Sequence, residues 1–489
     1  MTFTLDYIVR VSERLRNRSK QCLERRDYDS AIQYLSCMAY LKYSFYQGYC
    51  DGNIENDIKT ISNTIVRHHF NKDANKNLFV FYDSFACDNQ GLTEQYLDAL
   101  INNNFELIYI TRVSLERSKS SNVRQALEGY NKAQILQVPT NLSGVKCSQW
   151  IYDAICNSGA AKLLMQLAPD DIEECVAFAA LPPEITRYQI NLTDHTFWVG
   201  TNVMDYSFEF RPYGCNLSHN KRGFPKDRLL LQPFYPIMKS IPFEGFPQEC
   251  EGKFIFFTGG AIYKMMDSEL TFFRLCKNIL DKIPDSVILV AGGTKDDKTI
   301  NDAIVNFNMQ GRMIPIGLRR DIYEVFKHCD VFINTYPVGG GLMSQFAAQC
   351  SKPILNYMRN ECESVIGQKK KCEFTSYSEE SFISEAVHFY KEPSYRKQVG
   401  EYLNSAVITQ EEFRDTFYKA ITSNCSSYDI QWETDFVENK LDVKNAIKYA
   451  NETWGTYYGM YHRLKNKMFR LSPYMFIKLQ VHRFVKKFL

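Results

Sequence analysis

The pattern of apolar and polar residues changes twice along this 489-residue chain. Over residues 1–70 it is helical throughout, and Ala31, Tyr34, Leu35, Met38 and Leu41 share one helical face. Two aspartates just before them, at positions 27 and 29, are a helix start signal. The segment RRDYDSAIQYL is similar to one helix of a TPR-like hairpin, but no second copy follows at a fixed period. We therefore expect a helical appendage over 1–70.

Beyond a polar linker at 71–77, short buried runs alternate with helical patterns. Strands are predicted in LFVFYDSFA (78–86), FELIYITRV (105–113), AQILQVP (133–139) and ECVAFAALPPE (174–184). A helix is predicted over 148–167, before the last of these strands. This alternation predicts a doubly wound parallel sheet, and we assign residues 78–240 to an N-terminal Rossmann-like domain.

A proline-rich stretch over 229–249 predicts a hinge. Strands are then predicted in FIFFTGG (254–260), SVILVAGG (286–293), RMIPIG (312–317), DVFINTY (330–336) and PILNY (353–357). Helices are predicted at 267–283 and 321–328. We expect a second Rossmann-like domain over 250–420 and helices over 421–489. The predicted fold class is α/β, with two Rossmann-like domains facing a cleft.

The end of the chain, residues 461–489, is basic and amphipathic and contains no acidic residue. Its cations are Arg463, Lys465, Lys467, Arg470, Lys478, Arg483, Lys486 and Lys487. Apolar residues lie among them, including Leu464, Met468, Phe469, Phe476, Leu479, Phe484 and Phe488. This pattern predicts contact with an anionic membrane surface. The alternative is a C-terminal helix packed across both domains with a solvated basic side.

Composition limits the function and the compartment. A 45% hydrophobic and 23% charged content argues against wholesale disorder, and a net charge of +2 predicts no overall attraction to nucleic acid. Fifteen scattered cysteines without a CxxC pair indicate reduced thiols in the cytosol. No apolar run approaches the roughly 18–20 residues that span a bilayer. We therefore expect a cytoplasmic protein that can lie on the inner face of a membrane.

Glycines end several strands of the second predicted sheet. Gly259 and Gly260 allow close backbone approach, and Lys264 can reach phosphate oxygens. Gly292 ends the next strand in the same way. In the following loop Asp321 is a predicted helix cap.

Arginines and a second glycine loop complete this set. Arg319 or Arg320 can face a diphosphate, and Arg320 is favoured because it lies next to the helix start. A loop of three glycines, Gly339, Gly340 and Gly341, leads into a helix that starts near Leu342 and Met343. Amides and a helix N-terminus suit an anion, so the loop predicts binding of a nucleotide-activated donor. The alternative is a glycine-rich connection with no ligand.

In the first predicted sheet an apolar strand ends at Asp194 and His195. An imidazole can remove a hydroxyl proton, and the aspartate can orient it or accept the proton itself. Phe197 and Trp198 are predicted to form a sugar-stacking wall; the alternative is a capping aspartate and a core histidine.

A loop after the first strand carries Gln90 and Gly91, which we assign to the acceptor side or cleft, facing the donor or the acceptor. A tight turn explains this loop equally well.

The order of these features resembles GT-B-type glycosyltransferases, in architecture over residues 78–357. The segment GLRRDIYEVFKHCDVFINTYPVGGGLMSQFAAQCSKPIL (317–355) is similar to O-GlcNAc transferases and bacterial protein N-glucosyltransferases, as is a helical appendage. The resemblance implies a bacterial enzyme that uses a UDP-sugar donor without a metal or cofactor. It implies that the N-terminal Rossmann-like domain (78–240) carries the acceptor and that the C-terminal one (250–420) binds the nucleotide sugar. The implied acceptor is a glycan, a lipid-linked sugar or a protein in surface polysaccharide or glycoconjugate synthesis.

One residue departs from the pattern of that group. Many GT-B enzymes hold the ribose hydroxyls with Glu or Asp after the glycine loop, where this chain has Gln345. The amide hydrogen-bonds a diol without a charge, so the nucleotide stays open. The absence of an E-x7-E spacing favours inversion.

Two other functions remain as alternatives. One is a UDP-sugar epimerase, and the other is a non-catalytic GT-B-like subunit that binds a partner or a glycan. A role with nucleic acid has the least support, because no basic stripe with aromatics lies outside the tail.

Overall fold

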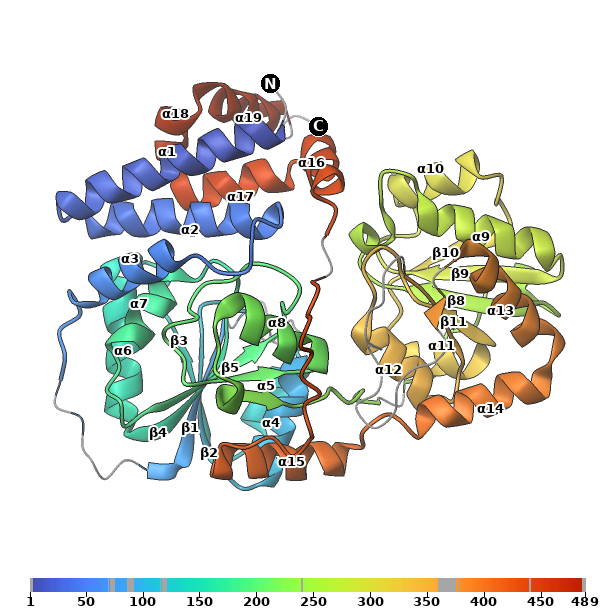
Figure 1. Ribbon diagram of the computed structural model, residues 1–489, viewed down its shortest axis with the longest axis horizontal. Helices are drawn as coiled ribbons and strands as arrows, with labels where there is room; N and C mark the ends of the chain where they lie inside the picture. Colours follow the sequence, from blue (N-terminus) through green and yellow to red (C-terminus); the bar gives the residue numbers. More distant parts are fainter. Residues whose placement is uncertain are drawn as a thin grey trace. The chain divides into compact units, whose positions relative to one another are not determined.

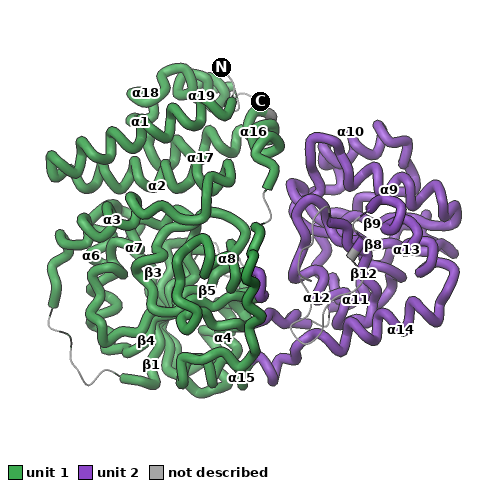
Figure 2. The backbone as a smooth tube through the Cα atoms, viewed as in Figure 1, with its two compact units in different colours: residues 1–210, 214–232, 414–489 green, residues 211–213, 233–413 purple. Residues whose placement is uncertain are grey.

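The structure is a computed structural model, and it describes residues 3–68, 70, 75–85, 92–114, 116, 121–238, 241–358, 375–376, 378–438 and 441–485. The chain forms two compact units (Figure 2). Unit 1 comprises Met1–Phe210, Gly214–Gln232 and Arg414–Leu489, and unit 2 comprises Arg211–Tyr213 and Pro233–Phe413. The first and last helices of the chain therefore belong to the same unit.

Unit 1 contains a parallel sheet in the order β3-β2-β1-β4-β5-β6-β7 (Figure 1). Its strands are β1 (Asn75–Asp83), β2 (Glu106–Thr111), β3 (Ala133–Gln137), β4 (Ala160–Gln166), β5 (Thr186–Asn191), β6 (Tyr206–Glu209) and β7 (Leu229–Leu231). Phe81 pairs in register with Tyr109 on one side and with Leu164 on the other. The strand order reverses between β1 and β4, as in a doubly wound sheet.

The helices of unit 1 include the predicted N-terminal appendage. Its three helices are α1 (Leu5–Glu24), α2 (Tyr28–Ser44) and α3 (Gly52–Ser62), so the helical prediction for this region is confirmed. The others are α4 (Leu92–Asn102), α5 (Asn122–Glu128), α6 (Val145–Ser158), α7 (Ile172–Ala180), α8 (Pro212–Arg222), α15 (Gln410–Ser423), α16 (Val443–Glu452), α17 (Gly455–Leu464), α18 (Lys467–Leu471) and α19 (Pro473–Val485).

One part of the sequence prediction in this unit is wrong. The helix expected over 148–167 ends at Ser158, because Gly159 takes the left-handed conformation with φ 70°. The following run AAKLLMQ is strand β4, whereas ECVAFAA, expected as a strand, lies in helix α7. Both runs are short and continuously apolar, and periodicity cannot separate a buried strand from a buried helix.

Unit 2 contains a second parallel sheet in the order β10-β9-β8-β11-β12-β13. Its strands are β8 (Phe254–Gly259), β9 (Ser286–Ala291), β10 (Met313–Gly317), β11 (Val331–Ile333), β12 (Ile354–Tyr357) and β13 (Thr375–Ser376). Its helices are α9 (Thr271–Lys282), α10 (Lys298–Asn306), α11 (Ile322–His328), α12 (Gly341–Gln349), α13 (Glu379–Lys391) and α14 (Pro393–Asn404). The predicted pair of Rossmann-like sheets is confirmed.

The C-terminal helices pack on the N-terminal ones, as Figure 1 shows for α17 and α18 beside α2 and α1. Phe3 and Asn451 exchange two hydrogen bonds of 2.6 and 2.9 Å. Leu464, Met468 and Leu479 are buried in the core that also holds the inner face of α2. These apolar residues of the tail are therefore core residues of unit 1, and fully burying one such side chain contributes about 1.5–3 kcal/mol.

Within the described ranges, no helix is both long enough and apolar enough to cross a bilayer.

Candidate functional site

The glycine-ended loops of unit 2 lie at the point where its strand order reverses. Strands β8 and β11 are neighbours there, although β9 and β10 lie between them in the sequence. Thr258 and Gly259 end β8, and Asn334 follows β11 directly. Open parallel sheets bind ligands outside the carboxyl ends of their strands at this position.

The loops after β8 and β9 fit tightly together. The Gly260 N–H donates to the Ala291 carbonyl (3.1 Å), and the Gly292 N–H donates to the Gly317 carbonyl (3.0 Å). A Cβ at Gly292 would lie 2.1 Å from the Gly260 carbonyl oxygen, and its φ is +120°. Gly292 thus acts by permitting this loop-to-loop contact, which holds the Gly259–Gly260 backbone in place.

The three-glycine loop is fixed by a side chain that the sequence prediction missed. Asn334 Oδ1 accepts hydrogen bonds from the N–H groups of Thr335 (3.0 Å) and Gly340 (2.8 Å). Asn334 Nδ2 donates to Asn356 Oδ1 (3.1 Å), and a Cβ at Gly339 would approach that nitrogen to 3.1 Å. The Gly340 amide is therefore occupied, which corrects the expectation that it faces an anion.

The backbone amides that are still available to an anion belong to the start of helix α12. It begins at Gly341, and its N-cap residue makes no side-chain capping hydrogen bond. The N–H groups of Gly341, Leu342 and Met343 are those that a helix leaves without an internal partner, at the positive end of its dipole. The buried Ser344 hydroxyl in the same turn has no hydrogen-bond partner among the described residues. This helix start can therefore accept an oxyanion.

Lys264 adds a positive charge to the loop after β8, and the backbone of this loop contacts the segment that leads into α12. It lies in the short 3-10 helix Ile262–Met265 after β8, and its carbonyl accepts from the Val338 N–H (3.4 Å). Burial lowers the pKa of Lys264. In the described parts of the chain no carboxylate lies within ion-pair distance of it. A half-buried ammonium without a counter-ion is well suited to a phosphate.

Of the two arginines predicted to face the diphosphate, Arg319 is engaged elsewhere. Its guanidinium donates to both Asp321 carboxylate oxygens (2.7 and 2.5 Å) and to the Gly245 carbonyl (2.8 Å). Asp321 also accepts from the Glu244 N–H (2.8 Å), and it makes no capping bond to its own helix. The assignment of Arg319 as a donor ligand is therefore wrong. Asp321 is the N-cap residue of α11, as predicted, but its side chain does not cap the helix. Arg320 is exposed and remains a candidate.

Gln345, the residue that departs from the GT-B pattern, is buried on α12. Its Oε1 has no hydrogen-bond partner in the described structure. Met343, two residues earlier, packs on Gly259, where a Cβ would come within 3.0 Å of the Met343 Cε. The other residues predicted to bind the donor lie in the loops after β8, β9 and β11 and in the first turns of α12. They are Gly259, Gly260, Lys264, Gly292, Gly339, Gly340, Gly341, Leu342, Met343 and Gln345.

In unit 1, His195 and Asp194 follow β5 and contact each other. His195 Nδ1 lies 3.3 Å from Asp194 Oδ1, and the His195 side chain is 32% exposed whereas Asp194 is fully buried. The alternative of a core histidine therefore does not hold. Because Asp194 is closed to solvent, it cannot accept a proton from a bound hydroxyl directly; it can orient the imidazole so that Nε2 faces outward.

The loop that carries this pair is held by Arg222, at the end of α8. One guanidinium nitrogen donates to the carbonyls of Thr193 (3.2 Å), Asp194 (3.0 Å) and Thr196 (2.7 Å). The other donates to Ser218 Oγ (3.1 Å). No local sequence signal points to Arg222, since it lies 26–29 residues from these carbonyls.

Phe197 and Trp198 do not form the predicted sugar-stacking wall. Both are buried in the core of unit 1, at 0% and 3% exposure. The Trp198 ring lies under the Arg222 guanidinium, 4.9 Å from ring centre to Cζ. Phe197 and Trp198 therefore support the loop after β5 from inside the core.

Gln90 and Gly91 lie outside the described residues. The helix that follows them, α4, is fixed by the buried Asp83 at the end of β1. Asp83 Oδ2 accepts from the hydroxyls of Thr93 (3.2 Å) and Tyr109 (2.7 Å). Nearby, Gln166 Nε2 at the end of β4 is buried and has no partner in the described structure. This is the strand-order reversal of the first sheet, the position at which open parallel sheets bind ligands.

Across the described chain, no group of three His, Cys, Asp or Glu side chains is arranged to hold a metal ion.

No protein-family model and no curated protein sequence matches the chain. Solved structures do match. An O-GlcNAc transferase from Thermobaculum terrenum superposes with a TM-score of 0.56 at 14% identity, over 90% of this chain and 83% of that one. A glycosyltransferase from Rickettsia africae gives 0.55 at 11% identity, over 72% and 100%. Anabaena HepE in complex with UDP and glucose gives 0.52 at 9%, over 71% and 99%.

At these identities the likeness is one of fold. The chain has a GT-B glycosyltransferase-like fold, and the resemblance seen in the sequence is confirmed at that level.

Proposed function

We propose that the protein is a glycosyltransferase that takes its sugar from a nucleotide diphosphate, with UDP as the favoured nucleotide. The observation that carries the proposal is the pairing of Lys264 with the uncapped start of α12 at the strand-order reversal of unit 2. A cation and free amides beside each other are suited to a diphosphate leaving group. The fold-level neighbour HepE binds UDP and glucose, which supports the choice of nucleotide.

In this proposal the acceptor hydroxyl oxygen attacks the anomeric carbon of the donor, and the bond from that carbon to the diphosphate breaks. His195 Nε2 takes the hydroxyl proton, while Asp194 holds the imidazole through Nδ1. The diphosphate leaves with the electron pair, and Lys264 with the α12 amides stabilises its charge. A single displacement inverts the anomeric configuration. The positive groups named here support a reaction without a metal ion.

The acceptor is a glycan, a lipid-linked sugar or a protein in surface polysaccharide or glycoconjugate synthesis. We assign it to unit 1, where the only direct support is the half-exposed His195 held by a buried carboxylate. We also place the protein at the cytoplasmic side of a membrane, as a peripheral protein. The exposed side of the tail helices is the basis for that placement.

The test is a His195→Ala variant. We expect it to bind UDP with unchanged affinity, measured by titration calorimetry, and to lose sugar transfer to acceptor. His68→Ala is the matched control, because His68 also contacts an aspartate in unit 1 (2.8 Å to Asp153) away from the loop after β5. Normal turnover by His195→Ala would remove it as the base.

A thermal-shift screen against nucleotide sugars identifies the donor. Stabilisation by none of them would favour the non-catalytic subunit. UDP release without any acceptor, together with a change in the sugar itself, would favour the epimerase. UDP release that requires an acceptor supports transfer.

A further inference from the structure

Helix α19 has two apolar sides. Met475 and Leu479 are buried in the core of unit 1. A second stripe faces solvent, with Tyr474, Ile477, Val481, Phe484 and Val485 between 46% and 64% exposed. Their spacing places these five residues within about a quarter to a third of the helix circumference, on the side away from the core. A continuous apolar stripe of this kind on a folded protein marks an interaction surface.

Cations flank the exposed stripe. Lys478 borders the stripe in α19, whereas Arg483 lies further round the helix, in a separate groove with Lys465. Arg470 lies nearby in sequence, and residues 461–485 contain no acidic residue. Among the described residues, neither Arg483 nor Lys465 has a carboxylate within ion-pair distance. Arg463 differs, because it forms an ion pair with Asp170 that fastens α17 to unit 1.

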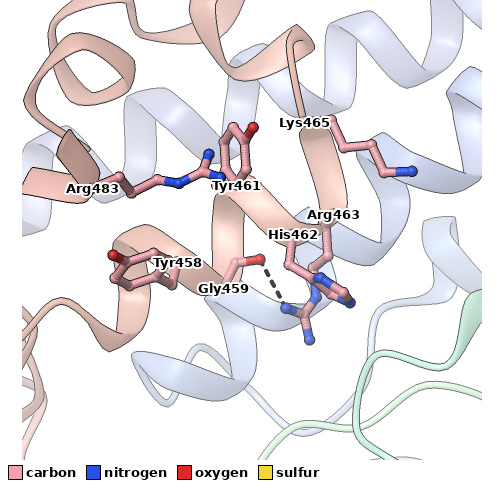
Figure 3. Close-up of a pocket in the computed structure, with 7 residues that line it drawn as sticks. All are labelled: Tyr458, Gly459, Tyr461, His462, Arg463, Lys465 and Arg483. Carbon is pink, nitrogen blue, oxygen red and sulfur yellow. Dashed lines mark hydrogen bonds between the residues drawn. The ribbon is translucent and has the colours of Figure 1, made fainter. Parts of the chain in front are cut away.

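Two grooves border α19. One, of about 600 Å³, is lined by Tyr458, Tyr461, His462, Lys465 and Arg483, among others (Figure 3). In it the Arg483 guanidinium points to the Tyr461 ring, 4.8 Å from its centre, and hydrogen bonding to Arg483 lowers the pKa of Tyr461. The other groove, of about 460 Å³, is mainly apolar and is lined by Trp454, Tyr474, Ile477 and Val481, with Lys478 at its edge.

We propose that this face of unit 1 docks on a bilayer that contains anionic phospholipid. The exposed stripe of α19 enters the boundary between headgroups and acyl chains, and Arg483 and Lys465 bind a lipid phosphate in the cationic groove. An apolar stripe together with cations that have no carboxylate partner matches a surface that is apolar inside and negatively charged outside. A nucleic acid and a soluble anion both lack an apolar region that could cover the exposed stripe.

The proposal does not depend on sugar transfer, and its test needs neither donor nor acceptor. The full-length protein is sedimented with vesicles of phosphatidylcholine alone and with vesicles that contain about one-third phosphatidylglycerol. Binding is expected only to the anionic vesicles, and it should weaken as salt rises. Arg483→Gln should weaken binding about fivefold. Ile477→Ser with Val481→Ser should weaken it by on the order of tenfold or more.

Each variant has a control elsewhere on the surface. Lys397→Gln removes a positive charge from a side chain of unit 2 that is 77% exposed, and Val66→Ser with Val305→Ser replaces two exposed valines. Both controls should bind like the unmodified protein. Equal binding to both kinds of vesicle, or no binding, overturns the proposal. It is also overturned if the unmodified protein does not bind vesicles and is a dimer in light scattering, while the Ile477→Ser, Val481→Ser variant is a monomer. The stripe would then be an interface with a second copy of the chain.

Discussion

The contact between the loops after β8 and β9 predicts that Gly292→Ala damages donor binding. The added Cβ would start 2.1 Å from the Gly260 carbonyl oxygen, whereas ordinary contact begins at 3.4 Å. The two loops must therefore separate by about 1.3 Å. Overpacking of this kind costs about 1–3 kcal/mol, and the left-handed φ of an alanine adds about 1–2 kcal/mol.

Gly311→Ala separates these two contributions. Gly311 also lies in unit 2 with a positive φ (+70°), but nothing lies within 4 Å of its added Cβ. It should lower the thermal midpoint slightly and leave UDP affinity unchanged. Gly292→Ala should lower the midpoint further and weaken UDP binding by roughly 5- to 150-fold in titration calorimetry. Equal midpoints and equal UDP affinities for the two variants would refute the assignment of Gly292 to the donor loops.

Three further predictions concern other parts of the molecule. Lys264→Met should weaken UDP binding by roughly 10- to 100-fold. Because burial lowers the pKa of Lys264, the UDP affinity of the unmodified protein should fall as pH rises through that lowered pKa. Over the same pH range the unliganded protein should gain stability relative to Lys264→Met. The same pH dependence in the variant would contradict this. Arg222→Lys, which keeps the charge but loses the planar fork, should lower kcat by about tenfold with UDP affinity unchanged, and a rise in KM alone would speak against a positioning role. Leu464→Ala should destabilise unit 1 by about 2–5 kcal/mol, whereas the exposed Ile477→Ala should change the thermal midpoint little.

The sequence was sufficient to predict that the chain contains two sheets, because most of the predicted strands are short buried runs that end at a glycine or a polar residue; β6, β7 and β13 were not predicted. It failed where two neighbouring runs were apolar throughout. The strand β4 and the helix α7 were exchanged there, although Asp171, Glu173 and Glu174 are helix start signals that could have corrected the second. The division of the chain into four domains, at 1–70, 78–240, 250–420 and 421–489, stays a prediction.

Site residues were predictable where the chain itself carries the signal, as in Gly259, Gly260 and Lys264 after a strand. Site residues were not predictable where a partner distant in the sequence determines the role of the side chain. Arg319 is bound to a segment 74 residues away, and Phe197 and Trp198 point into a core that only the folded unit defines. Asn334 had a local signal, a polar residue directly after a buried strand and before the glycines, which was overlooked.

Unit 2 is almost entirely one continuous stretch inserted into unit 1, whose own core is closed by α17–α19 against α1 and α2. During synthesis the ribosome therefore completes unit 2 before it makes the helices that complete unit 1. The inner apolar surface of the N-terminal helices therefore stays uncovered while more than 400 residues are translated. Chaperone binding to nascent chains should accordingly concentrate on this first helical hairpin and end when the last helices emerge.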